Sequence, residues 1–283
     1  VLSEIRSASK EKDVQREEWT SMEVIIVGLV LIAGGVFCSV FVSKKLKNKN
    51  IEIQYMKTST IGEVEKTLKE NEASGLQGYR EFVELKGVAE VETPQETPFT
   101  KRQVAYYEAD LYQVYEELHT YQDNKGNTQQ RMERRESRIS NQKSSGNLIL
   151  RDPQTGEQAY IRLTQMGMQL DTVKDFDKFE PQNIMQQYNF FNALRFTPMG
   201  TRTLGYKMTE KVIPLGHSLY VLGEACLENG RVYIDKPADR EKPFIVSVRN
   251  ESELVQSNKF KANLAFVGGI VLGLIGISIM LFG

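Results

Sequence analysis

The chain has 283 residues, of which 40% are hydrophobic and 26% are charged, as in an ordinary folded protein. Its 36 basic residues nearly balance 37 acidic ones, so the net charge of −1 offers no general attraction for nucleic acid, and no such partner is expected. Two cysteines and two histidines are too few for a cysteine-rich zinc site or a disulfide framework, so no metal or cofactor is expected.

The apolar residues gather in two runs, 24–42 and 264–282, each with 19 residues and no charged side chain. At about 1.5 Å per residue, each run roughly spans the hydrocarbon core of a bilayer. The sequence therefore predicts a two-pass membrane protein: a polar segment at 1–23, a first uncleaved membrane helix, a central domain at 43–263 and a second membrane helix.

Basic residues flank both runs on the side of the central domain. They are Lys44, Lys45, Lys47 and Lys49 after the first run, and Lys259 and Lys261 before the second. Since positive charge is enriched in cytoplasmic flanks, this pattern favours a cytoplasmic central domain. Neither run contains an ionisable acid, base or imidazole, which argues against an ion pathway or a transporter.

Small residues recur four apart in both runs, where they share one helical face. They are Gly35 and Ser39 in the first run, and Ala265, Gly269 and Gly273 in the second. Such a face allows close backbone approach, as in a packed hairpin or an oligomer seam. The alternative is that glycine is simply common in membrane helices.

The central domain begins with a predicted short helix, in which Thr60 is a capping residue before Ile61, Val64 and Leu68 at helical spacing. Beyond it, residues typical of strands dominate. Expected strands lie near 82–87, 104–115, 148–150, 159–163, 219–227, 232–234 and 244–248. Asn229-Gly230 predicts a tight hairpin between two of them. The fold class is α+β, mainly β, with an antiparallel β-rich domain between the two membrane helices.

Two stretches fit this pattern less well. The first carries the basic side chains Arg131, Arg134, Arg135 and Arg138, which predict a solvated ribbon or loop. A contact with a protein partner or with anionic lipid is the alternative for these arginines. The second, 171–196, mixes aromatic and polar residues and predicts a helical insert packed on the sheet.

Sequence motifs for catalysis are missing: no phosphate-binding glycine loop, nucleophile elbow or paired-histidine helix is found. His119 and His217 each lack a neighbouring acid and nucleophile. The sequence therefore predicts a protein without enzymatic activity.

Three motifs in the central domain resemble the GIDE-type domain, also called BAM for "beside a membrane". They are residues 82–88, residues 97–107, and residues 213–225, which read Ile-Pro-Leu-Gly-His-Ser-Leu-Tyr-Val-Leu-Gly-Glu-Ala. In this family the domain lies between two membrane helices of MAPL-like mitochondrial and chloroplast-envelope E3 ubiquitin ligases. The resemblance covers roughly residues 58–282.

The family's ligases carry a C-terminal RING domain, which needs about eight cysteine and histidine zinc ligands. This chain has four such residues, so it resembles a RING-less, prokaryotic branch similar to proteins of cyanobacteria. The resemblance implies partner binding near the membrane and no catalytic residues. The motif residues are therefore expected to serve the fold, namely Gly87, Pro98, Tyr106, Tyr107, Pro214, Gly216 and Gly223.

These observations predict a non-enzymatic scaffold that recruits protein partners at a bacterial inner or thylakoid membrane. The first alternative is a membrane effector that oligomerises on a signal, as in stress or phage defence. The second is a ubiquitin-ligase relative that needs a RING supplied by another subunit.

Overall fold

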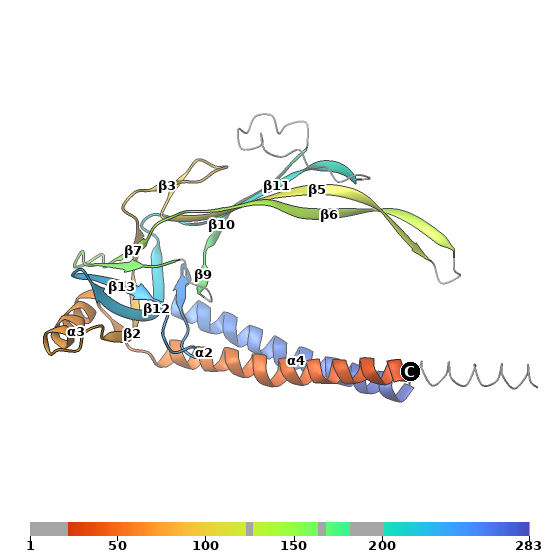
Figure 1. The fold of residues 1–283 in the computed structure, drawn as a ribbon, viewed down its shortest axis with the longest axis horizontal. Coiled ribbons are helices and arrows are strands. Elements are labelled where there is room, and N and C mark those ends of the chain that lie inside the picture. Colours follow the sequence, from red (N-terminus) through yellow and green to blue (C-terminus); the bar gives the residue numbers. More distant parts are fainter. Residues whose placement is uncertain (1–21, 123–126, 164–167, 182–200, 283) are drawn as a thin grey trace, which may run out of the picture. The chain divides into compact units, whose positions relative to one another are not determined.

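The computed structural model describes residues 22–122, 127–163, 168–181 and 201–282, so nearly all of the predicted polar segment 1–23 lies outside the described residues. The chain folds into two compact units. One comprises the residues up to Met56 together with those from Glu251 onward, and the other comprises Lys57–Asn250. The first unit is helical and the second is mainly β (Figure 1).

The helical unit is an antiparallel pair formed by the helix Met22–Tyr55 and α4 (Glu251–Phe282). Both helices are long and apolar enough to cross a membrane. Neither contains proline, which would remove a hydrogen bond from the helix interior. The helix α4 begins before the second apolar run and continues through it without interruption.

The first helix contains a π-helical turn, η1 (Phe37–Val42), before α2 (Ser43–Tyr55). One row of buried positions on α4 recurs every seven residues, at Val255, Ala262, Gly269 and Gly276. The corresponding row on the first helix is Gly28, Gly35, Ser43 and Asn50. The interval that includes η1 is eight residues, because a turn closed by i→i+5 bonds holds about one residue more than an α-turn. The buried positions therefore stay on one face.

The β-rich unit is built around five strands that close on themselves. In order of pairing they are β2 (Arg80–Glu90), β7 (Leu148–Arg151), β8 (Gln158–Ile161), β13 (Arg231–Asp235) and β12 (Ser218–Glu228). Because β12 also pairs with β2, the sheet forms a barrel. Numbered along the chain, the strands close in the order one, two, three, five, four, a Greek-key arrangement like that of OB-fold barrels. Its interior holds one side chain from each strand at 0–1% exposure: Leu85, Leu150, Ile161, Ile234 and Val221.

The hairpin predicted at Asn229-Gly230 is confirmed between β12 and β13. Glu228 and Arg231 are directly opposite, and both turn residues have positive φ, as a two-residue hairpin turn requires. The predicted short helix is also confirmed as α3 (Ile61–Ala73). Thr60 and Glu63 form a reciprocal capping box, and the apolar face of α3 joins the barrel core.

The expectation of a purely antiparallel sheet is wrong at three pairs. The strand β8 runs parallel to β13, the strand β1 (Thr58–Ser59) runs parallel to β2, and β14 (Ile245–Ser247) runs parallel to β9 (Gln169–Asp171). Parallel neighbouring strands need a long connection between them. In each of these pairs the connection contains at least one complete helix or strand. β14 also extends the sheet by pairing antiparallel with β12.

A second sheet is antiparallel and has four strands. In order of pairing they are β10 (Val173–Pro181), β11 (Thr201–Ile213), β5 (Tyr106–Gln122) and β6 (Thr128–Lys143). The strands β5 and β6 pair almost along their full length as a ribbon (Figure 1). A small pair, β3 (Gln95–Glu96) and β4 (Gln103–Val104), precedes this sheet in the chain.

The helical insert predicted over 171–196 is wrong for residues 173–181, which form β10. This strand pairs with β11 from Val173 to Pro181, with a bulge between Lys174 and Phe176. The bulge adds one residue, so the apolar positions do not alternate evenly in the sequence. Residues 182–200 lie outside the described residues.

Candidate functional site

The small residues predicted to mediate close helix approach meet within one chain. A Cβ atom added to Gly269 would overlap the carbonyl oxygen of Gly35 and lie 2.8 Å from the backbone nitrogen of Ser39. The hydroxyl group of Ser39 donates a hydrogen bond to the carbonyl of Gly35 at 2.6 Å, so it leaves no unpaired donor in the seam. Two roles were predicted for this face, a packed hairpin and an oligomer seam. This contact is the one expected for a packed hairpin.

The remaining predicted small residues are placed differently. A Cβ atom on Gly273 would meet nothing within 4 Å, although the backbone nitrogen of Gly273 lies 2.9 Å from where a Cβ of Gly35 would stand. Ala265 is half-buried. Gly276, which follows these residues on α4, contacts Gly28: a Cβ on Gly276 would lie 2.6 Å from the carbonyl oxygen of Gly28. Gly28 was not predicted, and a spacing of seven counted back from Gly35 would have found it.

The predicted flanking lysines lie at one level of the helix pair. Ser39 contacts Gly269 at one end of this level, and the side-chain amide of Asn50 donates to the carbonyl of Val255 at 3.2 Å at the other. Four of the lysines lie between these contacts on the first helix and two lie between them on α4: Lys44, Lys45, Lys47, Lys49, Lys259 and Lys261. Segments far apart in the sequence thus form one cationic band.

Among the family-motif residues, the glycines serve close approaches and a turn. A Cβ atom on Gly87 would lie 2.5 Å from the carbonyl oxygen of Arg151, and one on Gly223 would lie 2.7 Å from the Ile234 side chain. Gly216 has φ +70° in the turn before β12, and Pro214 lies just ahead of it.

Pro98 lies in the loop between β3 and β4, and this loop closes on a buried carboxylate. The N–H of Phe99 donates to Glu210 at 2.5 Å, and the hydroxyl group of Thr100 donates to the other oxygen at 2.6 Å. Glu210 has 0% exposure, so these bonds replace the water that its carboxylate loses. No local sequence pattern indicates this long-range anchor.

The two motif tyrosines begin β5. Tyr106 belongs to the barrel core, and burial raises the pKa of its hydroxyl group to about 12. Tyr107 is half-buried, and its backbone N–H donates a hydrogen bond to the hydroxyl oxygen of Ser144 at 3.0 Å. These contacts serve the fold and involve no ligand-binding geometry.

The four arginines predicted as a basic surface separate between the two faces of β6, because side chains alternate along a strand. On one face Arg138 lies 3.5 Å from Asp110, and Arg134 lies over the ring of Phe179 at 5.3 Å. On the other face, both arginines make ion pairs at 2.5 Å, Arg131 with Glu133 and Arg135 with Glu117. The structure thus divides these arginines and neutralises most of their charge.

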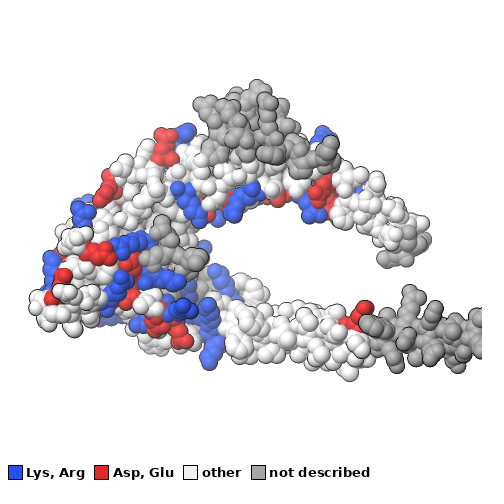
Figure 2. Space-filling view, viewed as in Figure 1, with Lys and Arg blue, Asp and Glu red and all other residues white. Residues whose placement is uncertain are grey.

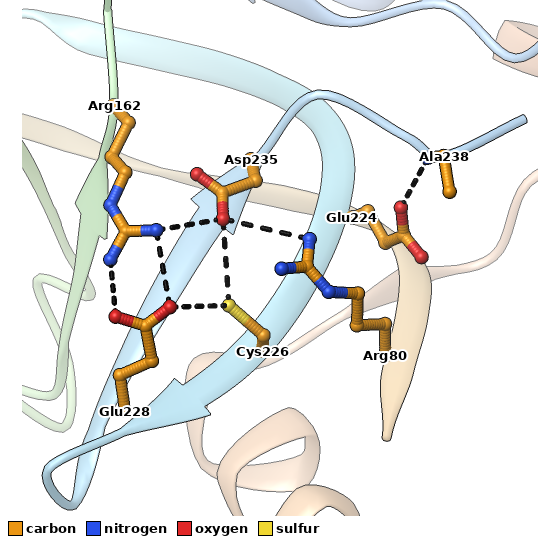
Figure 3. A network of polar contacts seen from close by, with 7 residues as sticks. All are labelled: Arg80, Arg162, Glu224, Cys226, Glu228, Asp235 and Ala238. Carbon is orange, nitrogen blue, oxygen red and sulfur yellow. Dashed lines mark hydrogen bonds and ion pairs between the residues drawn. The ribbon is translucent and has the colours of Figure 1, made fainter. Parts of the chain in front are cut away.

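A polar cluster on the outer side of the barrel was not predicted (Figure 3). Arg162 joins two carboxylates, binding Glu228 at 2.5 and 3.2 Å and Asp235 at 2.9 Å. The thiol of Cys226 donates to Asp235 at 3.6 Å, and Arg80 lies 3.7 Å from the same carboxylate. Two positive and two negative groups therefore compensate each other around a thiol.

The cluster includes three groups of metal-ligand type. The Cys226 sulfur and one oxygen each of Glu228 and Asp235 lie within 4.8 Å of one another. However, arginine already occupies both carboxylates, and a metal ion would have to displace it. Burial, followed by the charge of Asp235, raises the pKa of Cys226 to about 11, so the metal-binding thiolate is scarce at neutral pH. The arrangement suits a structural network better than a metal centre.

Comparison with known proteins identifies the family. The model of the GIDE family, described as E3 ubiquitin ligase, matches residues 116–282, more than half of the chain. The chain belongs to the GIDE family. This confirms the family suggested by the sequence motifs. Pro214, Gly216 and Gly223 lie inside the matched region, whereas Gly87 and Pro98 precede it.

The E3 ubiquitin-protein ligase SPL1 of Arabidopsis thaliana is 35% identical to this GIDE-family chain over 121 residues. The aligned part makes up 40% of the chain and 33% of the plant protein, so the chain spans about a third of that relative's length. No solved structure matches the chain significantly.

The thiol of this GIDE-family protein provides a pH-dependent test of the cluster. Because the raised pKa of Cys226 favours the neutral thiol, we expect the rate of its alkylation in the folded protein to reach half of its maximum near pH 11. In urea the half-maximal rate should come near pH 8.5, the ordinary range of a cysteine pKa. The unfolded state loses its proton first, so the stabilisation is complete below about pH 8.5 and is lost as the pH rises to about 11.

The measurement is the rate of iodoacetamide alkylation by mass spectrometry in a Cys38→Ala variant, which leaves Cys226 as the one thiol. A half-maximal alkylation rate near pH 8.5 in the folded protein would contradict the buried environment and raised pKa of Cys226.

Proposed function

We propose that this GIDE-family chain is a two-pass membrane protein whose β-rich unit recruits protein partners beside the membrane. In this proposal the chain acts as a scaffold and not as an enzyme. The single observation that carries the anchoring is the helix pair: both helices are long and apolar enough to span a bilayer, and glycine contacts pack one against the other.

The ribbon of β5 and β6 supports partner recruitment. Leu118 and Met132 are directly opposite each other in the ribbon and are 52% and 50% exposed. Beside them on the same face, Glu116 and Arg134 are also directly opposite each other. An aliphatic pair framed by charges on a long ribbon suits a protein interface with an apolar centre and a polar rim.

The test is purification of the tagged chain from its native membrane, with quantification of what co-purifies. We compare the parent with a Leu118→Thr/Met132→Thr variant, since threonine preserves strand propensity while removing apolar surface. Leu76→Thr is the matched control, because Leu76 is 54% exposed and lies outside the ribbon.

A stoichiometric partner that survives in the control and falls several-fold in the ribbon variant is the expected result. Equal recovery in both variants would move the interface elsewhere. Recovery of no partner from any preparation would contradict the scaffold.

Extraction of the chain by alkaline carbonate would contradict the membrane anchoring. Protease digestion of inverted and right-side-out vesicles tests the cytoplasmic placement of the β-rich unit.

The oligomerising effector remains a second proposal, with one observation in its favour. Cβ atoms on Gly34, Gly268 and Gly273 would meet nothing within 4 Å, so these faces stay open for a second copy. A pure homo-oligomer in the same purification, with leakage from reconstituted liposomes, would favour this role over the scaffold.

The relationship to an E3 ubiquitin ligase supports a third proposal, a RING partner acting in trans, which the same purification would identify.

A further inference from the structure

The cationic band of the helix pair has no acidic counterpart within its own segments. The lysine collar consists of Lys44, Lys45, Lys47, Lys49, Lys259 and Lys261. Residues 40–50 and 256–268, which contain the collar, include six lysines and no aspartate or glutamate. The collar therefore concentrates positive charge from two helices at one level.

The lysines of the collar project outward from the pair. Lys44, Lys45, Lys47, Lys259 and Lys261 are exposed. Among the described residues, these five form no ion pair with a carboxylate. Lys47 lies over the ring of Phe266 at 5.9 Å, so its ammonium group lies near an apolar side chain of the adjoining run. This is how lysine places an aliphatic stem on apolar surface and its charge at a boundary.

The two ends of the apolar stretch differ in charge. Figure 2 shows Lys and Arg atoms at one end of the uncharged stretch and acidic atoms at the other. At that second end the described residues include Glu23 and no basic residue. Attraction between anionic headgroups and the collar therefore favours placing the collar end of the helix pair at an anionic leaflet surface.

The collar is slightly longer than the thickness of one headgroup layer. Between Ser43 and Asn50 the first helix rises about 10 Å at 1.5 Å per residue. The polar headgroup region of one leaflet is roughly 5–8 Å thick. When the adjoining 19-residue run occupies the hydrocarbon core, all six ammonium groups come within reach of lipid phosphates.

We propose that the lysine collar binds the headgroups of anionic phospholipids and holds them as an annulus around the helix pair. The proposal rests on the proposed membrane anchoring and adds a lipid class and the contacting residues. It differs from simple orientation by the positive-inside rule, which requires basic charge but no selective occupancy by anionic lipid.

The test is native mass spectrometry of the full chain in neutral detergent with equimolar phosphatidylglycerol and phosphatidylcholine. The collar variant is Lys44→Gln/Lys45→Gln/Lys259→Gln. The matched control is Lys66→Gln/Lys69→Gln/Lys101→Gln, which removes the same charge from exposed lysines of the β-rich unit. Inorganic phosphate is added in a separate arm to distinguish a lipid from a free phosphate.

We expect phosphatidylglycerol adducts to outnumber phosphatidylcholine adducts several-fold in the parent and the control, and the preference to fall to about one in the collar variant. Phosphate should leave the preference unchanged. Equal numbers of phosphatidylglycerol and phosphatidylcholine adducts in the parent would overturn the collar proposal. Loss of the preference on adding phosphate would overturn it as well. Either result would leave the membrane anchoring intact. A parent chain that stays in the aqueous phase after detergent removal would overturn both.

Discussion

Replacing Gly269 by leucine should separate the two helices. Any Cβ at this position overlaps the carbonyl oxygen of Gly35, and the remaining leucine atoms need still more space. The neighbours are backbone atoms, which cannot turn aside as a flexible side chain can. Overpacking of a well-packed seam costs about 1–3 kcal/mol in soluble proteins, and the loss of backbone contact over several turns places this variant at the upper end.

The measurement is the distance between spin labels at Glu23 and Leu281, two exposed positions at the far end of the pair, in a background with both native cysteines replaced by alanine. The parent should give one narrow, short distance, and Gly269→Leu a broad distribution at longer distances. Gly273→Leu is the matched control, since a Cβ there meets nothing within 4 Å. Identical distributions for the two variants would contradict the seam described here.

Replacing Arg162 by methionine should lower the stability of the β-rich unit far more than replacing an exposed arginine. Asp235 is 3% exposed and would lose its ion pair with Arg162, while Arg80 lies 3.7 Å from its carboxylate. Removing one partner of a buried ion pair costs about 3–5 kcal/mol, and the remaining arginine should reduce this to roughly 2–3 kcal/mol. Glu228 adds little because its side chain is 42% exposed.

Arg231→Met is the control because it also removes an arginine that lies over a barrel tyrosine. Arg231 lies over Tyr160 at 5.1 Å, whereas Arg162 lies over Tyr233 at 4.3 Å. The ion pair of Arg231 is fully at the surface, so its loss should change stability by about 0.5 kcal/mol or less.

Chemical denaturation followed by near-ultraviolet circular dichroism of the tyrosines measures both variants. Adding Asp235→Asn to Arg162→Met should recover part of the loss, because the buried charge is then removed as well. Equal destabilisation by the two arginine variants would show that stacking on tyrosine, rather than the buried carboxylate, determines the effect.

The sequence predicted those features that depend on neighbouring residues. The two uncharged runs, the Thr60 cap and the Asn229-Gly230 turn each rest on a few consecutive residues, and each is present in the structure. The family motifs were equally local, and the family is confirmed. Closure of the barrel was not predictable, because it depends on the pairing of β2 with β12, more than a hundred residues apart.

Errors arose where the assumed period does not hold. The bulge in β10 breaks the two-residue period of a strand. A spacing of four on α4 selected Gly273, where a Cβ would meet nothing within 4 Å, and Gly28 lies seven residues from Gly35 rather than four. The cluster around Cys226 was invisible for a different reason: its two arginines come from β2 and from the end of β8, far from the hairpin that holds the other members.

The π-turn also determines which changes of length the first helix can accept. Removing one residue between Phe37 and Val42 would convert η1 to an ordinary α-turn and restore an unbroken interval of seven between buried positions. Adding one residue there would instead rotate everything beyond it by about 100°. Asn50 would then turn away from Val255. Natural variation in length at this turn should therefore be one-sided, with deletions tolerated and insertions excluded.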